Sequence, residues 1–486
     1  MADGRPQPFQ ANTPGRQDLA AIIAATTAAI DPMRLVLDRL SLQQPASQLQ
    51  SAGQPVTVAG PATLDLDRVD QIVVVGGGKA AAGFAAGIEA LLGPQRLKQH
   101  RVRGLVSVPA GCGLPLAEIE VRETRPSGVN LPTAAVVTAT HEMLAMLGRL
   151  GPDDLAIVLI TGGGSALLEA PVEGISLPLL TRITQQLAAA GADITAINTV
   201  RRAVSQVKGG GLAGSCTAGR LLAVVLSDVI GDDLGTIASG PCLPASIEID
   251  GLAAMLARYQ VPASDRELLL QAARLAAGSR PPAAADSAGR WITPAGCRVG
   301  HLLLGSNATA VGAAAAAARA LGYQVVAADT VTADETANDV GVRLAQKSQQ
   351  LLAACQQDGR PQALIEGGEA TVVVPADHGR GGRNQQTVLA AVQQLLASSH
   401  QLLSPPQLLL ASFGTDGEDG PTSAAGGFTD PQITASLRQQ PAALRHAIDR
   451  CDAHPLLAAA GGLIETGPTG TNVADVRIML FQPGSS

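Results

Sequence analysis

The chain has 486 residues, a formal net charge of −7 and an aromatic content of only 2%. A chain of this length is expected to form two or more domains with sizeable cores. The acidic balance and the absence of Lys/Arg-rich runs argue against a nucleic-acid-binding surface, and the few aromatic side chains argue against base stacking. The six cysteines are scattered without a C-x-x-C pair, which favours buried free thiols over a zinc site or disulfides.

The N-terminal segment, residues 1–17, is predicted to be a disordered tail. No apolar run reaches the length of a membrane span, and the first residues lack the basic-then-apolar pattern of a signal peptide. We therefore expect a cytoplasmic protein that acts on small molecules, with no nucleic-acid or membrane partner. A monomer and a homodimer are both compatible with the sequence.

The first glycine-rich segment reads QIVVVGGGKAAAG. Its apolar run, Ile72–Val75, predicts a strand buried on both faces, and a helix is expected to begin near Lys79. The N–H groups and dipole at such a helix N-terminus favour an anion, so Gly77 and Gly78 are candidate phosphate-binding residues and Lys79 is a candidate cation. The alternative is a tight strand-to-helix turn whose glycines only permit close packing.

Two further glycine clusters follow. Leu155–Ile160 predicts a second buried strand, and ligands of open α/β sheets gather at the carboxyl ends of strands. The segment after it, TGGGSA, makes Gly163, Gly164 and Ser165 candidate phosphate-binding residues. Ser165 is not in a G-x-S-x-G elbow, which favours a hydrogen-bonding role over a nucleophilic one. The third cluster, KGGG, adds Lys208 as a candidate cation.

A carboxylate follows the next predicted strand, Leu221–Leu226. Asp228 lies close to the end of this strand, which is a usual place for a metal ligand or a general base. Helix capping explains Asp232 and Asp233 as well as a functional role does, but Asp228 comes too early for a simple cap. Asp228 is therefore the candidate base or metal ligand of this half of the chain.

The clearest linker in the sequence is GSRPPAAADSAG. The strand and helix pattern restarts beyond it. The predicted organisation is a tail over 1–17, an α/β domain over 18–280, a linker over 281–290 and a second α/β domain over 291–486. Each domain is expected to contain a mostly parallel sheet flanked by helices.

The strongest local feature of the second half is HGRGGRNQ, which follows an expected strand at Thr371–Val374. Its glycines free the backbone, and the side chains of Arg383 and Asn384 are expected to point at whatever lies before the next helix. Arginine binds planar oxyanions bidentately, so phosphate or carboxylate is the expected ligand. The alternative is a solvated basic turn.

An acidic segment, FGTDGEDGP, follows a further predicted strand. Its carboxylates among glycines are suited to Mg²⁺ or to hydrogen bonds from hydroxyl groups. Asp416 and Asp419 are therefore candidate metal ligands. The alternative is a solvated acidic turn.

Taken in chain order, eight motifs resemble those of the class II glycerate 2-kinases, whose genes are often labelled hydroxypyruvate reductase: VVVGGGKAA, LITGGGSALL, INTVRRAVSQVKGGGLA, LSDVIGDDLGTIASGP, GGEATV, GRGGRNQ, SFGTDGEDGPTSAAGG and TGPTGTNVADV. The resemblance covers about residues 18 to 482. It implies a Rossmann-like first domain, a MOFRL-type second domain and an active site in the cleft between them. Many members carry a Gly-His-Pro-x-Pro segment where this chain has Arg125-Pro126, so the role of that histidine is not carried over.

The resemblance implies ATP-dependent, Mg²⁺-assisted phosphorylation of D-glycerate at the 2-hydroxyl, giving 2-phosphoglycerate and ADP. Position by position, the family's glycine-loop lysine is Lys79, and the arginine of its GGRNQ motif is Arg383. Phosphoryl transfer needs charge neutralisation and in-line positioning, so both cations are expected to act on one polyanion. Asp228 is then expected to orient the 2-hydroxyl or to bind Mg²⁺.

Two other functions fit parts of the sequence. An NAD(P)H-dependent hydroxypyruvate reductase is the first, but the glycine loop lacks the acidic residue, about 20 positions on, that holds a ribose. A non-catalytic sensor of sugar acids or nucleotides is the second, and an assay of ATP turnover distinguishes it from an enzyme.

Overall fold

The computed structural model describes residues 8–43, 48–51, 63–126, 128–279, 284–285, 290–331, 335–398 and 407–483. The chain forms two compact units. We call Pro32–Leu304 the central unit, and Met1–Asp31 together with Gly305–Ser486 the terminal unit. Each unit is an α/β domain with its own sheet, as the sequence predicted.

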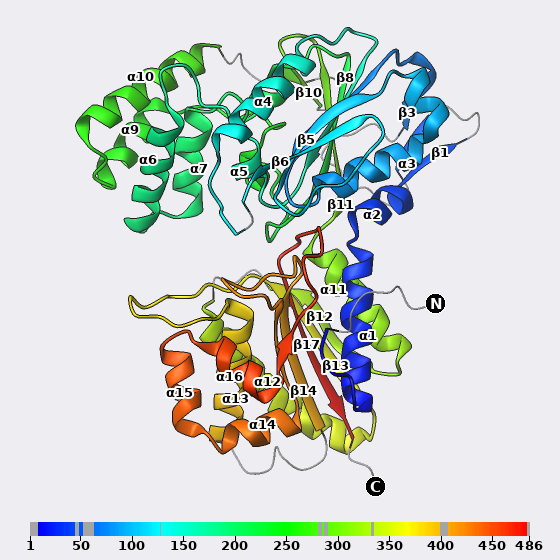
Figure 1. The fold of residues 1–486 in the computed structure, drawn as a ribbon, viewed down its shortest axis with the longest axis vertical. Coiled ribbons are helices and arrows are strands. Elements are labelled where there is room, and N and C mark those ends of the chain that lie inside the picture. Colours follow the sequence, from blue (N-terminus) through cyan, green and yellow to red (C-terminus); the bar gives the residue numbers. More distant parts are fainter. Residues whose placement is uncertain are drawn as a thin grey trace. The chain divides into compact units, whose positions relative to one another are not determined.

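The central unit is built on an eight-stranded sheet with the order β6-β5-β4-β7-β8-β11-β10-β9 (Figure 1). Its strands are β4 Ile72–Gly77, β5 Arg103–Pro109, β6 Ile119–Arg125, β7 Leu155–Ile160, β8 Arg220–Leu226, β9 Ala284–Ala285, β10 Trp291–Ile292 and β11 Arg298–Gly305. The first five of these strands are parallel, whereas β9, β10 and β11 pair antiparallel. The middle strands β4 and β7 are buried along their whole length, which explains their unbroken apolar sequences.

Some helices of the central unit pack apart from its main sheet. The helices of this unit are α2 Pro32–Arg39, α3 Ala81–Gln99, α4 Ala134–Leu147, α5 Gly164–Leu167, α6 Leu177–Ala189, α7 Ile194–Ala203, α8 Gly211–Gly214, α9 Ile249–Arg258 and α10 Ala263–Ser279. Helices α6, α7, α9 and α10 pack around a hydrophobic cluster of their own, beside the sheet (Figure 1). Two 3₁₀ turns, Leu66–Arg68 and Ile237–Ser239, and a three-stranded antiparallel sheet complete the unit. That small sheet contains β1 Leu40–Gln43, β2 Gln48–Ser51 and β3 Thr63–Asp65.

The terminal unit contains a six-stranded sheet with the order β12-β13-β17-β14-β15-β16. Its strands are β12 Gln324–Thr330, β13 Gln362–Gly368, β14 Gln407–Gly414, β15 Gly426–Thr429, β16 Leu463–Ile464 and β17 Asp475–Gln482. Only β12 and β13 pair in parallel, and the other four neighbouring pairs are antiparallel. The prediction of a mostly parallel second sheet is therefore wrong, because β17 returns between β13 and β14 in the opposite direction.

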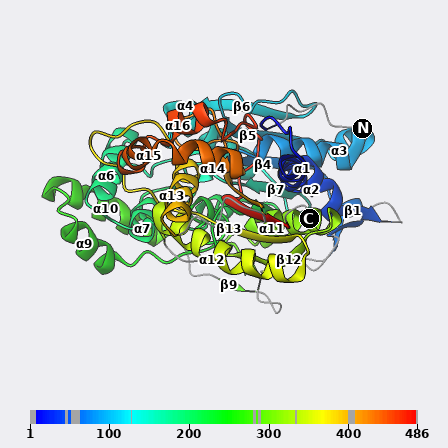
Figure 2. The same ribbon diagram turned by 90° about the horizontal axis from the view of Figure 1, so that it is seen from below.

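The helices of the terminal unit are α1 Pro14–Ala29, α11 Asn307–Ala320, α12 Ala337–Asp358, α13 Arg383–Ser398, α14 Pro431–Arg438, α15 Pro441–Asp449 and α16 Ala453–Ala460. Helix α1 packs along α11, from the other end of the sequence, and buries Leu19, Ile22 and Ile23 (Figures 1 and 2). No single described helix is both long and apolar enough to cross a membrane; α1 and α2 reach that length only as a pair bent by 63°.

The segment predicted to be a disordered tail is ordered from residue 8 onwards, and residues 1–7 lie outside the described part of the chain. The ring of Phe9 lies 4.3 Å from that of Phe428, centroid to centroid. Arg16 is buried and donates through Nε to Asp430 at 2.7 Å. These partners lie more than 400 positions away in the sequence, so no local pattern could have revealed them.

The division into units differs from the predicted domains. Strands β9, β10 and β11 complete the sheet of the central unit, so the division falls after Leu304, and most of the predicted linker over 281–290 lies outside the described residues. The predicted strand at Thr371–Val374 is also wrong. Only Thr371 forms an isolated bridge, with Thr336, and the side chain of Val373 points to solvent with 82% exposure.

Candidate functional site

Three predicted groups of the central unit lie at one edge of its sheet, where β4, β7 and β8 end side by side. Lys79 follows β4, Gly163 follows β7, and Asp228 follows β8. Helix α3 begins at Ala81, close to the predicted start. Its N-cap residue, Ala80, has no side chain that could cap it, and the N–H of Ala80 donates to Oγ1 of Thr161 at 3.1 Å. We call Lys79, Gly163 and Asp228, together with Arg125 described below, the glycine-loop site.

The glycines after β4 serve strand packing. A Cβ on Gly78 would lie 2.0 Å from the Oγ1 of Thr161, and the φ angle of Gly78 is +138°. Its N–H donates to the carbonyl of Ser107 at 3.1 Å, and that of Lys79 donates to the carbonyl of Gly162 at 2.9 Å. Gly77 belongs to β4, where a Cβ would meet the carbonyl of Leu167 at 3.0 Å.

The packing alternative therefore explains Gly77 and Gly78. Because neighbouring strands and loops already accept these N–H groups, the structure does not support the predicted phosphate contact through the amide of Gly78. The positive contribution of this loop comes from the Lys79 side chain and from the dipole of α3.

A second cation, from the end of β6, lies beside Gly163. Arg125 is the last residue of that strand, and its side chain is buried, with 6% exposure for the whole residue. The position that a Cβ on Gly163 would take lies 3.4 Å from Nη2 of Arg125 and 3.9 Å from Cγ of Lys79. The guanidinium of Arg125 and the aliphatic part of the Lys79 side chain therefore border Gly163, whose φ angle of +76° favours glycine.

Asp228 and the second glycine cluster meet directly. The N–H of Gly163 donates to Oδ2 of Asp228 at 3.3 Å. Gly164 begins the short helix α5, and its N–H donates to the carbonyl of Thr161 at 3.0 Å. Asp228 thus lies beside the glycine-loop cations, where the sequence placed it, although its role as a base or a metal ligand stays a prediction.

Ser165 and Lys208 hold α5 in place. The Oγ of Ser165 lies 3.0 Å from that of Ser239. Lys208 is completely buried, and its Nζ donates to the carbonyls of Ser165 and Leu168, both at 2.9 Å, and to Glu169 at 3.1 Å. Burial lowers the pKa of Lys208, and the charge of Glu169 works in the opposite direction.

The predicted phosphate contact of Lys208 is therefore wrong, because its three donors are spent on internal acceptors and no part of it reaches the surface. The backbone of the third glycine cluster, which follows Lys208, is also engaged within the protein. The N–H groups of Gly209 and Gly210 donate to the carbonyls of Ser239 and Gly240. Lys208 is a positioning residue for α5.

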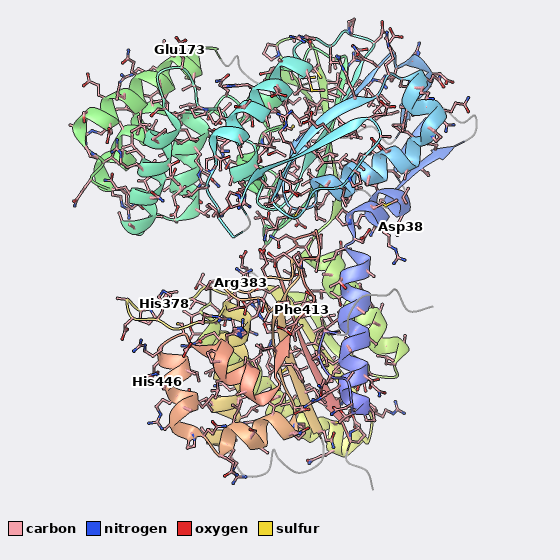
Figure 3. The ribbon with its side chains drawn as sticks, in the orientation of Figure 1. Asp38, Glu173, His378, Arg383, Phe413 and His446 are labelled. Carbon is pink, nitrogen blue, oxygen red and sulfur yellow. The ribbon has the colours of Figure 1, made fainter. Side chains whose placement is uncertain are left out.

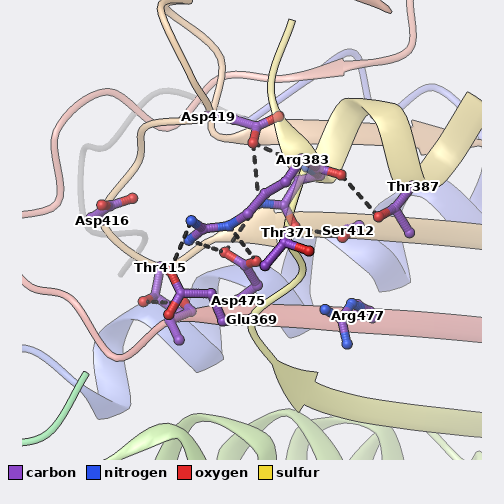
Figure 4. Close-up of polar contacts among 12 residues, drawn as sticks. Glu369, Thr371, Arg383, Thr387, Ser412, Thr415, Asp416, Asp419, Asp475 and Arg477 are labelled. Carbon is purple, nitrogen blue, oxygen red and sulfur yellow. Dashed lines mark hydrogen bonds and ion pairs between the residues drawn. The ribbon is translucent and has the colours of Figure 1, made fainter. Parts of the chain in front are cut away.

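In the terminal unit, Arg383 is the first residue of α13, at the end of the sheet where Phe413 of β14 also lies (Figure 3). Its Nε and Nη2 donate to the two oxygens of Asp475 at 2.7 and 2.9 Å, and its Nη1 pairs with Glu369 at 2.8 Å (Figure 4). Burial opposes the charge of Arg383, but Asp475 and Glu369 more than offset this effect, and the pKa of Arg383 lies above its usual value. The bidentate fork expected to hold a substrate oxyanion is occupied by Asp475.

Asn384 and Asp419 close the N-terminus of α13. Oδ1 of Asp419 accepts from the N–H of Asn384 at 3.0 Å, and Oδ2 accepts from the N–H of Gln385 at 2.9 Å. The Asn384 side chain donates to Asp419 and Asp475 and accepts from Ser412 at 2.6 Å. Burial raises the pKa of Asp419 to about 6, against the opposing effect of these backbone N–H groups.

Two predictions fail here for the same reason. Asn384 is 1% exposed and Asp419 is 2% exposed, and the polar atoms of both are engaged within the protein. Asn384 is therefore a positioning residue and not a phosphate ligand, and Asp419 is a helix cap and not a metal ligand. We call Arg383, Glu369, Asp475, Asn384 and Asp419 the arginine site.

Asp416, the second predicted metal ligand, accepts the N–H of Glu418 at 3.1 Å within its own turn. In the part of the chain that the structure describes, no group of three or more His, Cys, Asp or Glu side chains is arranged to hold a metal ion. The carboxylates predicted for Mg²⁺ thus do not form a protein cage for it.

Sequence reasoning missed three of the groups that matter at these sites. Arg125 was noted only as a departure from a family motif, although a cation at the last position of a strand beside the glycine loops is a usable signal. Glu369 and Asp475 lie in quoted motifs, GGEATV and TNVADV, but their pairing with Arg383 joins positions about 14 and 92 residues apart.

Comparison with known proteins gives consistent results. Residues 18–270 match DUF4147, a domain of unknown function, and residues 362–475 match the MOFRL family. Human glycerate kinase is 34% identical over 467 residues, covering 85% of this chain and 84% of that protein. Glycerate 2-kinase of Pyrococcus horikoshii is 31% identical over 459 residues, covering 94% and 96%. A crystal structure of glycerate kinase from Thermotoga maritima aligns with a TM-score of 0.73 and 30% identity, covering 96% of this chain and 100% of that one.

Proposed function

The chain belongs to the glycerate kinase family, and on this premise we propose that it transfers the γ-phosphoryl group of ATP to the 2-hydroxyl of D-glycerate, giving 2-phosphoglycerate and ADP. The observation that supports this reaction is the cationic corner of the glycine-loop site. Lys79 and Arg125 border Gly163 there, near the start of α3. A phosphoryl group in transfer carries charge that such groups neutralise.

In this proposal, Lys79 is the catalytic cation that contacts a phosphate. Arg125 lies mostly beneath the surface and raises the positive potential at the same corner. Asp228 holds the N–H of Gly163 and orients the hydroxyl that attacks, taking its proton as the new O–P bond forms. Arg383 is a third positively charged group, and its action on the same reaction as Lys79 stays a prediction.

Mg²⁺ is the proposed metal partner of ATP. The predicted ligand Asp419 does not fit the ion, because both of its oxygens accept hydrogen bonds from the start of α13. When bound to ATP, Mg²⁺ supplies charge neutralisation at the phosphates. The roles proposed above belong to the chain's own side chains.

The decisive experiment is identification of the product by NMR after incubation with ATP, Mg²⁺ and D-glycerate. We expect phosphorus coupled to the proton on carbon 2, together with ADP in equal amount. The K79M variant, purified in the same way, is the control against a contaminating kinase. Phosphorylation at carbon 3, or no phosphorylation at all, would overturn the proposal.

The alternative reductase is tested with the same preparation. Mixing the protein with NADH or NADPH and hydroxypyruvate should give no loss of nicotinamide absorbance above background. Oxidation of the cofactor that depends on the protein and on hydroxypyruvate would favour the reductase. We also propose a cytoplasmic monomer or homodimer without nucleic-acid or membrane partners; light scattering of the purified protein measures its oligomeric state.

A further inference from the structure

The guanidinium of Arg383 is shared by two carboxylates that differ in accessibility. Asp475 is fully buried and holds Nε and Nη2, whereas Glu369 is half-exposed, with 47% of its side chain open to solvent, and holds Nη1 (Figure 4). Arg383 itself retains 31% exposure. The contact with Glu369 is therefore on the solvent side of the guanidinium.

Asp475 is fixed in place by more than Arg383. It is the first residue of β17 and pairs there with Gly368 of β13 and Gly414 of β14. The Asn384 amide donates to its Oδ1 at 3.1 Å. Since a buried carboxylate that loses its partners is strongly disfavoured, Asp475 remains on Arg383 throughout any ligand binding.

Glu369 is much more exposed than Asp475. It lies just beyond the end of β13, after Gly368, whose φ angle of +144° is a backbone conformation that favours glycine. Its ion pair with Nη1 is partly exposed, and such pairs contribute little because water competes for both charges. A ligand can replace this contact at small cost.

The local charge balance also points to Glu369. One guanidinium faces two carboxylates, so with both ionised the set Arg383, Asp475 and Glu369 has a net charge of −1, to which the nearby Asp419 adds when it is ionised. When the Glu369 side chain swings into solvent, the site loses one negative charge, and Nη1 becomes available as a charge-assisted donor.

We propose that Glu369 is an internal competitor that occupies the place on Nη1 of Arg383 where an oxyanion of the substrate binds, so that it sets the affinity for that anion. The oxyanion is a carboxylate or a phosphate. The inference rests on the proposed function in taking D-glycerate and ATP as its sources, and the measurements below separate the two.

The test is the pair of variants E369A and E369Q. We expect E369A to lower KM for one anionic substrate about fivefold or more, and E369Q to lower it less, because a neutral amide still accepts a hydrogen bond from Nη1. KM is measured separately for D-glycerate and for ATP with Mg²⁺. A fall in KM for D-glycerate alone identifies a carboxylate, and a fall for ATP alone identifies a phosphate.

The matched control is D377N. Asp377 forms a similar ion pair with Arg450 at 2.8 Å, with side-chain exposures of 72% and 39%, in the same unit. Removing that carboxylate should leave both KM values within twofold. If E369A also leaves both values within twofold, or raises them, the proposal is overturned.

A double-variant cycle separates competition from a structural role. In an R383Q background, E369A should no longer change KM, because the competitor has lost the group for which it competes. An effect of E369A that persists in that background overturns the proposal. The melting temperature of each variant reports on structural damage.

The outcome is also distinguishable from failure of the proposed function. Calorimetric titration of the wild-type protein and of E369A with D-glycerate, and separately with inorganic phosphate, needs no turnover. Tighter binding of either anion by E369A supports the competitor even if the protein proves not to phosphorylate glycerate, and equal or weaker binding of both overturns it.

Discussion

Lys79 and Arg383 both lie where a helix begins after glycines, yet their surroundings differ. At the start of α3, which follows Lys79, the neutral hydroxyl of Thr161 accepts the N–H of Ala80, and a second cation, Arg125, lies close by. At Arg383, Asp419 caps the start of α13, and two carboxylates hold the guanidinium. A glycine-rich turn with a cation therefore does not by itself make an anion site. At Arg383, Asp475 of β17 and Glu369 beyond β13 take up the positive charge, and at the glycine-loop site Asp228 lies near the cations.

The largest effect should follow from removing the Lys79 charge. K79M is expected to lower kcat/KM about 100-fold or more, since a donor that stabilises developing charge is worth about 3–4 kcal/mol. Steady-state kinetics with an unchanged melting temperature is the measurement. Near wild-type kinetics would show that Lys79 is not the catalytic cation of the glycine-loop site.

A smaller loss is expected at Arg383. In R383K the charge stays, but a single ammonium cannot hold both oxygens of Asp475 and Glu369 together. We expect kcat/KM to fall roughly 10- to 100-fold together with a lower melting temperature. If lysine at this position works as well as arginine, the fixed geometry with Asp475 has no functional weight.

A variant of Lys208 tests whether this residue positions α5 or binds phosphate, as the sequence predicted. K208M removes the cation that pairs directly with the buried Glu169 carboxylate and leaves only the charge of Arg201 near it, and breaking a buried pair costs about 3–5 kcal/mol of stability. The measurement is thermal or denaturant unfolding, alongside KM for ATP. A stable variant with a raised KM for ATP would restore Lys208 as a phosphate ligand and contradict the structure.

A variant of Arg125 tests the contribution of the second cation at the glycine-loop site. R125Q is expected to lower kcat/KM about 10-fold, because a buried charge near the phosphates is lost. R122Q is the matched control: Arg122 lies on the same strand and pairs with the surface carboxylates of Glu120 and Glu142. An equal effect in both variants would show that Arg125 acts only through the stability of β6.

The last expected effect concerns the pH dependence of stability at the arginine site. The pKa of Asp419 is about 6 in the folded protein and about 3.9 in an unfolded chain. Between these values the folded state binds more protons, so this group's contribution to stability falls as pH rises from about 4 to about 6. D419N lacks this titration and should therefore gain on the wild type over the same window, by at most about 3 kcal/mol. A melting-temperature difference that is independent of pH would contradict it.

Local patterns predicted the longer strands of the central unit but not their order within the sheet. Continuous apolar runs identified β4, β7 and β8, and the carboxylate and glycine motifs after them were placed correctly at one edge of the sheet. The antiparallel return of β17 and the place of α1 could not be predicted, since both depend on contacts between distant parts of the chain.

The sequence was enough to tell which residue types follow each strand, and it placed Lys79, Gly163 and Asp228 at the carboxyl ends of strands. These residues come together because β4, β7 and β8 pair side by side in parallel. Only the tertiary structure decided which of the polar groups are available. Lys208, Asn384 and Asp419 match the sequence patterns of ligand-binding residues. Each of them is buried, however, and therefore satisfies its charge or hydrogen bonds within the fold. A buried polar group must find partners, and those partners come from anywhere in the chain.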